Sequence, residues 1–147
     1  FYDGSADHAD RLAVTYTFGG TKLRGAYERL RYQPAPGQSV YRDAWQLAAT
    51  LSFGPHQLRA SYTYGADAHG DTTKAVGGIG VPGSGSGAWQ ISLGYGYTLS
   101  KRTEVWTSFT RLVNGETARY NLSGNPLPQL TAGDAATAFG VGITHKF

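Results

Sequence analysis

The 147-residue chain contains 21 Gly and 10 Tyr but no Cys, which excludes disulfide bonds, thiolate metal sites and a cysteine nucleophile. Its formal net charge of +3 is too small to indicate a nucleic-acid-binding surface, and only 16% of its residues are charged. This length suits one domain, and the Gly-rich, Tyr-rich and charge-poor composition favours strands over helices.

Apolar and polar residues alternate along most of the chain, which is the period of a strand with one apolar and one polar face. In chain order, the predicted strands are Arg11–Phe18, Leu23–Tyr32, Ala44–Phe53, Gln57–Tyr64, Trp89–Leu99, Glu104–Leu112 and Phe139–Phe147. The second, fourth and sixth of these follow the pattern less cleanly. The sequence therefore predicts an all-β protein with seven strands.

Short and long connections alternate strictly between these strands. Short turns are predicted at Gly19–Lys22, Gly54–His56 and Ser100–Thr103. Long loops rich in Gly, Pro, Asn, Asp and Ser are predicted at Gln33–Asp43, Gly65–Gly87 and Val113–Asp134. An antiparallel up-and-down sheet follows, with the short turns at one end and the long loops at the other.

The polar positions of the strands carry mostly Thr, Ser, Gln, Gly and Ala, which would make a poor water-facing surface for a soluble protein. Aromatic residues gather near strand ends: Phe18, Phe53, Tyr97 and Phe147 by the short turns or terminus, and Tyr27, Trp45, Tyr64, Trp89 and Phe139 towards the long loops. Two aromatic girdles around an apolar outer face are typical of an outer-membrane barrel. We therefore predict a transmembrane β-barrel, with a soluble lipocalin-like barrel as the alternative.

The order of the connections also predicts an orientation. Bacterial outer-membrane barrels place short turns in the periplasm and long loops outside the cell. The last strand would then descend to a periplasmic Phe147, and residues 1–10 would lie outside the cell. Because single-chain bacterial barrels have an even number of strands, we expect residues 1–147 to be the C-terminal part of one larger barrel domain.

Two segments resemble general porins of Gram-negative bacteria, most closely the betaproteobacterial type. Leu99–Arg111, LSKRTEVWTSFTR, resembles the penultimate hairpin of that family, and Phe139–Phe147, FGVGITHKF, is similar to its C-terminal strand. The resemblance implies a sixteen-stranded homotrimeric barrel that passes ions and small hydrophilic solutes by diffusion, with this chain as strands 10 to 16. It also implies that the alternating Phe139, Val141, Ile143 and Phe147 form the signal read by the outer-membrane assembly machinery. The family's constricting third loop would lie in the other half of the barrel, so no constriction residue is assigned.

Strand parity assigns one set of side chains to the polar face, where charges would bias which ions enter a pore. These candidate pore-lining residues are Arg24, Glu28, Gln46, Gln57, Arg59 and Gln90. As solvated wall residues, each would have a small individual effect. Arg29 and Arg31 have the opposite parity and are expected at the loop-side rim, near lipopolysaccharide phosphates, as is Arg111 unless a bulge reverses its facing. The basic excess predicts a mild preference for anions.

The sequence offers little to an enzyme, and we expect no catalytic residue, cofactor or metal. Gly78–Gly83 matches the G-x-G-x-x-G pattern, but Pro82 and the following Ser-Gly repeat prevent the helix that a dinucleotide site needs. Two alternatives remain open. One is a complete eight-stranded outer-membrane barrel of structural or adhesion type, which requires an eighth strand. The other is an outer-membrane hydrolase that uses His8 or His69 with neighbouring Asp residues.

Overall fold

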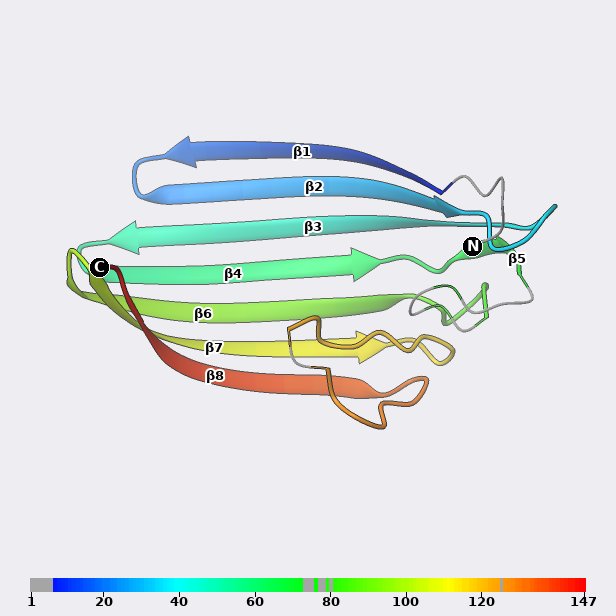
Figure 1. The fold of residues 1–147 in the computed structure, drawn as a ribbon. Helices are drawn as coiled ribbons and strands as arrows, with labels where there is room; N and C mark the ends of the chain where they lie inside the picture. The colour runs from blue at the N-terminus through cyan, green and yellow to red at the C-terminus, as the bar shows by residue number, and fades with distance from the viewer. Residues whose placement is uncertain (1–6, 73–75, 77–78, 80, 125) are drawn as a thin grey trace.

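The computed structural model describes residues 7–72, 76, 79, 81–124 and 126–147, and these residues form one antiparallel sheet (Figure 1). Its strands are β1 (His8–Phe18), β2 (Thr21–Tyr32), β3 (Ser39–Phe53), β4 (His56–Gly65), β5 (His69–Asp71), β6 (Ala88–Ser100), β7 (Thr103–Asn114) and β8 (Ala135–His145). Within this described part of the chain, no helix is long and apolar enough to cross a membrane.

The seven long strands pair in the order β1-β2-β3-β4-β6-β7-β8, so the predicted all-β, up-and-down topology is confirmed. The long connection predicted at Gly65–Gly87 contains the three-residue strand β5, which adds an eighth strand to the seven predicted. β3 is 15 residues long and extends beyond the end of β4. The N-terminal segment of β3 beyond β4, Ser39–Tyr41, pairs with β5 and so continues the sheet into the loop.

The strands are longer and the turns tighter than predicted. Residues 8–10 belong to β1, and the turn after Phe18 consists of Gly19 and Gly20 alone, so Lys22 lies in β2 rather than in a turn. Gly19 has a φ of 52°, which a non-Gly residue rarely adopts. A Cβ on Gly20 would stand 2.2 Å from the carbonyl oxygen of Ser52, so this turn can approach β3 only with Gly. At the other end of the chain, Phe147 lies beyond the last residue of β8.

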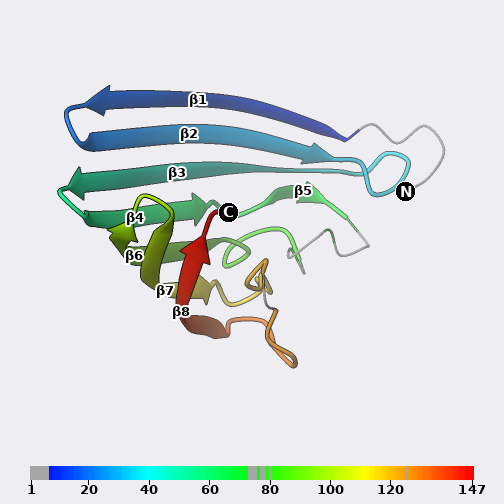
Figure 2. The same cartoon turned by 60° about the vertical axis from the view of Figure 1, so that its left-hand side comes forward.

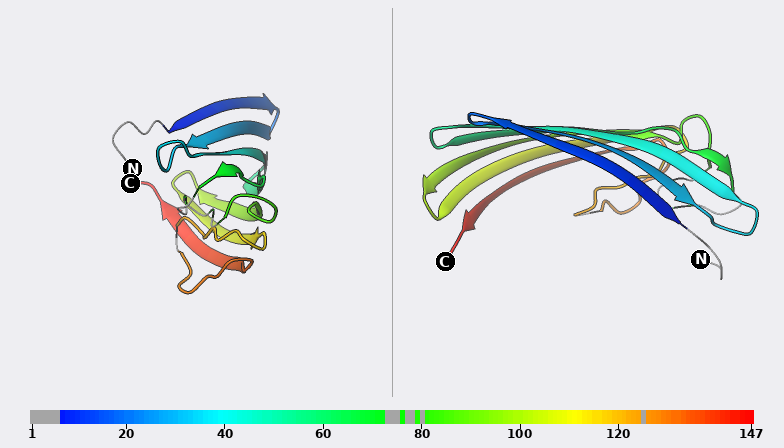
Figure 3. Two further views of the ribbon diagram at one scale, coloured as in Figure 1. Left: turned by 90° about the vertical axis from the view of Figure 1, so that its right-hand side faces the viewer. Right: turned by 90° about the horizontal axis from the view of Figure 1, so that it is seen from above.

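The sheet curves into an arc, with the short hairpins at one end of the strands and the long connections at the other end of the strands (Figures 1 and 2). Seen along the strands, β1 and β8 form the two ends of the arc, and the long loops lie on its concave side (Figure 3). Among the described residues, β1 pairs only with β2 and β8 only with β7, so the arc is open.

The buried apolar cluster of the structure lies among the loops rather than between sheet layers. Val40 and Ala68 are fully buried there, Ile79 is 2% exposed, and Tyr120 packs against them. Asn114, at the end of β7, fixes the following loop: its Nδ2 donates to the carbonyl oxygen of Tyr120 at 3.0 Å, and its Oδ1 accepts from the Tyr120 amide at 2.8 Å. The loops are thus tied together at the loop end of the strands, whereas both broad faces of the sheet meet the surroundings directly.

Two glycines of the G-x-G-x-x-G match, Gly78 and Gly80, lie outside the described residues.

Candidate functional site

The cross-strand register sorts the strand residues into two faces, because directly opposed residues point to the same side of a sheet. One face carries the six candidate pore-lining residues Arg24, Glu28, Gln46, Gln57, Arg59 and Gln90. Arg42 belongs to the same face and lies 4.9 Å from the ring of Tyr120, which is in the loop between β7 and β8. Part of this loop, drawn in orange, lies on the inner side of the arc (Figure 3). The polar face is therefore the concave one. That it lines a pore stays a prediction at this point.

A charged network crosses the polar face from β4 to β7. Arg59 Nη2 donates to Glu104 Oε1 at 2.7 Å, and Arg59 Nε donates to Gln57 Oε1. Gln57 in turn donates from Nε2 to the Ser52 hydroxyl at 3.2 Å. Between the two charged residues lies Gly96, where a Cβ would stand 2.6 Å from Glu104 Oε1. The glycine therefore makes room for the ion pair to lie flat against the sheet.

Charge on the polar face is unbalanced. Its strand residues include five cationic side chains, Arg11, Lys22, Arg24, Arg42 and Arg59, and two carboxylates, Glu28 and Glu104. Both carboxylates are already engaged: Glu104 by Arg59, and Glu28 by Arg11 at the longer distance of 3.5 Å. Lys22 and Arg24 form no ion pair with any described residue. The concave face therefore presents uncompensated positive charge.

The opposite, convex face is apolar and exposed. Leu12 is 67% exposed, Leu47 is 64% exposed and Val141 is 69% exposed. Large apolar side chains on every long strand from β1 to β8 are also exposed. Soluble monomers seldom expose a contiguous apolar surface of this extent. Lipid-facing strands of outer-membrane barrels carry such a band on their outer side.

Aromatic side chains cluster at both ends of the convex face. At the short-turn end, His56 stacks on Phe53 at 5.1 Å between ring centroids, meets Tyr97 edge-on and hydrogen-bonds through Nδ1 to the Tyr95 hydroxyl at 2.8 Å. At the loop end, Trp45 packs between Tyr27 at 5.7 Å and Tyr64 at 5.8 Å. Five of these residues were predicted for the two girdles: Phe53, Tyr97, Tyr27, Trp45 and Tyr64. His56 and Tyr95 were not predicted there.

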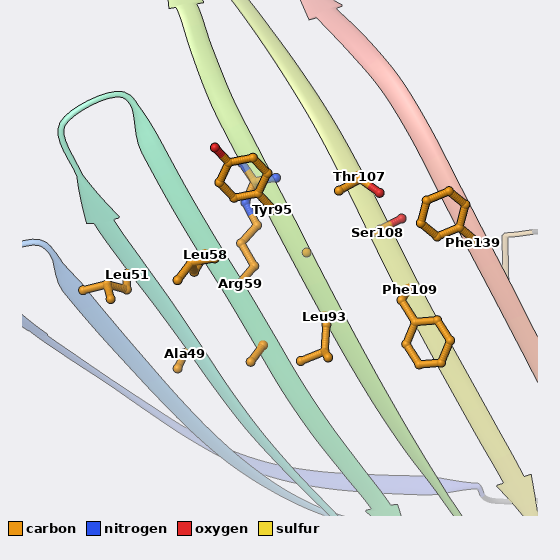
Figure 4. A pocket seen from close by; sticks show the side chains of 12 residues that line it. Ala49, Leu51, Leu58, Arg59, Leu93, Tyr95, Thr107, Ser108, Phe109 and Phe139 are labelled. Carbon is orange, nitrogen blue, oxygen red and sulfur yellow. The ribbon is translucent and has the colours of Figure 1, made fainter.

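Phe139 was predicted with the loop-side aromatics, and that placement is wrong. It is the fifth residue of β8, opposite Phe109 and in register with Leu93, because the strand starts at Ala135. With these residues it borders an apolar groove of about 490 Å³ on the convex face (Figure 4). The small side chains of Ala49 and Ala60 hollow the groove between Leu51, Leu58 and Leu93, so its walls suit hydrocarbon rather than a polar solute.

Some charged strand residues have the parity opposite to that of the candidate pore-lining residues. They lie at the loop-side end of the convex face, as predicted. Arg29 pairs in bidentate fashion with Asp43, at 2.7 Å from Nε to Oδ1 and 2.8 Å from Nη2 to Oδ2, and the Tyr27 hydroxyl donates to the same carboxylate. The charge of Arg29 is thus already compensated. The register also assigns Arg111 to this face, opposite Ile91. The shift between Thr98 and Ser100 lies too far along the strand to reverse it.

The predicted assembly residues Phe139, Val141 and Ile143 share the convex face of β8. They are 72%, 69% and 66% exposed. Phe147 follows the strand, and its ring meets that of His145 edge-on at 5.0 Å. His145 also shares a hydrogen bond of 2.9 Å with the Thr103 hydroxyl, which ties the end of β8 to the start of β7. The signal role of this strand stays a prediction.

The His and Asp residues proposed for a hydrolase do not assemble in the described part of the chain. His69 stacks on Tyr41 at 5.3 Å, whereas Asp67 accepts a hydrogen bond from the Gly87 amide. Asp7 accepts one from the Gln33 amide. No group of three or more His, Cys, Asp or Glu side chains that could hold a metal occurs among these residues.

Four charged residues and one tryptophan of the polar face were not among the predicted pore-lining residues: Arg11, Lys22, Arg42, Glu104 and Trp106. Glu104 has the required parity but lies 45 residues from Arg59 in sequence, so only the register reveals the pair. Lys22 was assigned to a turn. Trp106 lies across β8, where a Cβ on Gly142 would stand 2.4 Å from its ring. Parity alone would have identified Glu104 and Trp106.

Comparisons with known proteins agree on one family. The sequence model described as Gram-negative porin matches residues 2–118. The outer membrane porin protein 32 of Delftia acidovorans is 27% identical over 139 residues, which are 92% of this chain and 36% of that protein. The solved anion-selective porin from Comamonas acidovorans is also 27% identical, with a TM-score of 0.74 over 99% of this chain and 41% of that one. OmpT of Vibrio cholerae shares the fold, with a TM-score of 0.68 over 95% of this chain and 41% of that one, at 18% identity. The chain thus spans about 36% of the length of its curated relative.

Proposed function

The chain belongs to the Gram-negative porin family and is a protein of the bacterial outer membrane, and from this premise we propose that it forms part of the wall of a diffusion channel. Ions and small hydrophilic solutes would pass through a water-filled lumen along the concave face. Transport of this kind needs binding groups and a clear path, but no catalyst and no cofactor.

The observation that carries the proposal is the opposite chemistry of the two faces. The convex face exposes Leu, Val, Tyr and Phe side chains between two aromatic clusters, which suits contact with lipid. The concave face carries the ion pair of Arg59 with Glu104, together with Lys22 and Arg24, which suits contact with water. A sheet of this kind separates hydrocarbon from an aqueous path.

We further propose that this sheet is the C-terminal part of one closed barrel. In lipid, the outer N–H and C=O groups of β1 and β8 need partners, since an unpaired backbone group in hydrocarbon is costly. Further strands would supply these partners. The resemblance to general porins favours sixteen strands, a homotrimer and recognition of the terminal strand by the assembly machinery. Lipopolysaccharide at the loop-side rim is a proposed neighbour of Arg31 and Arg111.

A preference for anions is the expected selectivity. The polar face has more cationic than anionic strand side chains, and both of its carboxylates are paired. A positive wall raises the local concentration of anions and lowers that of cations. The relative from Comamonas acidovorans is described as anion-selective, which supports the same expectation.

Reconstitution of the native protein in planar bilayers tests the channel. We expect discrete conductance steps and, under a salt gradient, a reversal potential on the anion-selective side. Folded protein that gives no steps would contradict the channel and favour a closed small barrel. Cleavage of lipid or peptide that disappears in His8→Ala or His69→Ala would favour the hydrolase. A cation-selective reversal potential would contradict the expected selectivity alone.

A further inference from the structure

A second hollow, of about 490 Å³, lies on the concave face near the short-turn end. It spans β1 to β4 and the turn between β1 and β2. Its lining residues are Thr17, Gly19, Gly20, Thr21, Lys22, Arg24, Ala48, Thr50, Ser52 and Gln57. Apart from Thr21, which lies opposite Phe18 and Leu51 of the convex face, the strand residues among them share the concave face in the register. Their side chains therefore converge from neighbouring strands.

Two cations lie side by side in this hollow. Lys22 and Arg24 are two residues apart on β2, so their Cα atoms are separated by about 7 Å. Lys22 lies opposite Thr17 on β1 and Thr50 on β3, and Arg24 lies opposite Ala48. Ala48 leaves open the space into which the Arg24 side chain can reach. Lys and Arg together provide a point charge and a planar donor fork for an oxyanion.

No described acidic side chain lines this hollow. On the β4 side, the positive charge of Arg59 is held by Glu104 at 2.7 Å. On the loop side of the same face, Glu28 is four residues beyond Arg24 on β2 and is paired with Arg11. The charges of Lys22 and Arg24 therefore lack an internal counterion in the described structure, and an anion from solution would supply one.

Hydroxyl groups complete a donor set around the two cations. Thr17, Thr50 and Ser52 line the hollow from β1 and β3. The Ser52 oxygen accepts a hydrogen bond from Gln57 Nε2 at 3.2 Å, which leaves its own proton to donate. Neutral donors beside two positive charges match a small anion with several acceptor oxygens.

We propose that this hollow binds a small divalent oxyanion, of the size and shape of sulfate or inorganic phosphate, as it passes through the channel. Lys22 and Arg24 balance its two charges, and the hydroxyls of Thr50 and Ser52 donate hydrogen bonds to its oxygens. No described carboxylate lines the hollow to compete for these hydroxyls. The proposal rests on the proposed channel function and goes beyond it, because a general anion preference requires no discrete site.

Block of chloride current by sulfate tests the site in the native protein, reconstituted in planar bilayers at constant ionic strength. Bound sulfate should reduce chloride conductance with a saturable concentration dependence. Perchlorate, a tetrahedral anion with one charge, should block only at higher concentration. Lys22→Met and Arg24→Met each remove one of the two cations. Each should raise the half-blocking sulfate concentration about tenfold, once the screening of the charge–charge attraction by salt is included.

Lys101→Met is the matched control, because Lys101 lies in the β6–β7 turn at the same end of the sheet and outside the hollow. It should leave sulfate block unchanged. Normal conductance with equal sulfate block in the wild type and both variants would overturn the site while the channel stands. Folded wild-type protein without conductance would overturn the channel and the site together. Gel mobility before and after heating checks folding, and Lys22→Gln replaces any Met variant that does not fold.

Discussion

Removal of the carboxylate of Glu104 should make the channel more anion-selective. In the wild type, Glu104 Oε1 lies 2.7 Å from Arg59 Nη2, and the side chains are 29% and 43% exposed. Glu104→Gln keeps the size and much of the hydrogen bonding of the side chain but removes its charge. The Arg59 guanidinium would then act on passing ions as a fourth uncompensated cation on the described polar face, beside Lys22, Arg24 and Arg42.

The size of the effect follows from screened electrostatics. A unit charge about 5 Å from a passing ion in water contributes about 0.8 kcal/mol, and salt near 0.1 M reduces this to about 0.5 kcal/mol. The contribution is favourable for an anion and unfavourable for a cation, so the two effects combine in the permeability ratio. We expect the anion-to-cation permeability ratio to rise about fivefold, since each 1.4 kcal/mol is a factor of ten. An exposed pair contributes little to folding, at most about 1 kcal/mol, so the barrel should still assemble.

Reversal potentials in a salt gradient measure this ratio directly. Glu116→Gln is the control, because it removes the same charge from an exposed turn residue outside the strands. We expect the Glu104 variant to move the reversal potential further to the anion side than the Glu116 variant does. Equal shifts in both variants, or a shift to the cation side, would refute the assignment of Glu104 to the channel wall.

Four further substitutions test the faces, the turn and the loop. Leu47→Arg should destabilise the folded protein in lipid by about 2–4 kcal/mol, whereas the neighbouring Gln46→Arg should cost little, as urea unfolding in vesicles would show. Gly20→Ala should cost more than about 1 kcal/mol in the same assay, because its Cβ would collide with the Ser52 carbonyl oxygen. Hydrogen bonds to its carboxylate from a neighbouring turn lower the pKa of Asp134. The ionised carboxylate therefore stabilises the folded protein at neutral pH, and this stabilisation is lost as pH falls below about 4. Amide hydrogen exchange of that turn should therefore accelerate in acid, and at neutral pH in Asp134→Asn.

Alternation predicted the strands well because it reports directly on two faces in different surroundings. Seven strands and the shared face of the candidate pore-lining residues follow from parity, and the order of the strands follows from the alternation of short and long connections. The short strand β5 has no alternation in its three residues, His69–Asp71, and exists because β3 leaves its edge unpaired there. Strand ends were missed for a related reason: Asp43, read as loop, is held in β3 by its bidentate pair with Arg29 on β2.

The chemistry of the polar face depended on register, which the sequence did not supply. Parity places Arg59 and Glu104 on the same face but does not pair them, because Glu104 lies on a strand that follows two connections later. For the same reason, a count of net charge treats all 13 basic residues alike. The structure separates the paired arginines from Lys22 and Arg24, and that distinction decides where an anion would bind.

Glycine on the concave face links this chemistry to an open path. Gly96 leaves room for the Glu104 carboxylate, and Gly142 leaves room for the ring of Trp106, so both large side chains lie along the wall. A Cβ at either position would push its neighbour away from the sheet, into the space that is the lumen of the proposed channel. The small residues that weaken the strands by propensity therefore keep charged and aromatic groups close to the wall. In the proposed channel, this arrangement would let the wall carry selectivity without filling the lumen.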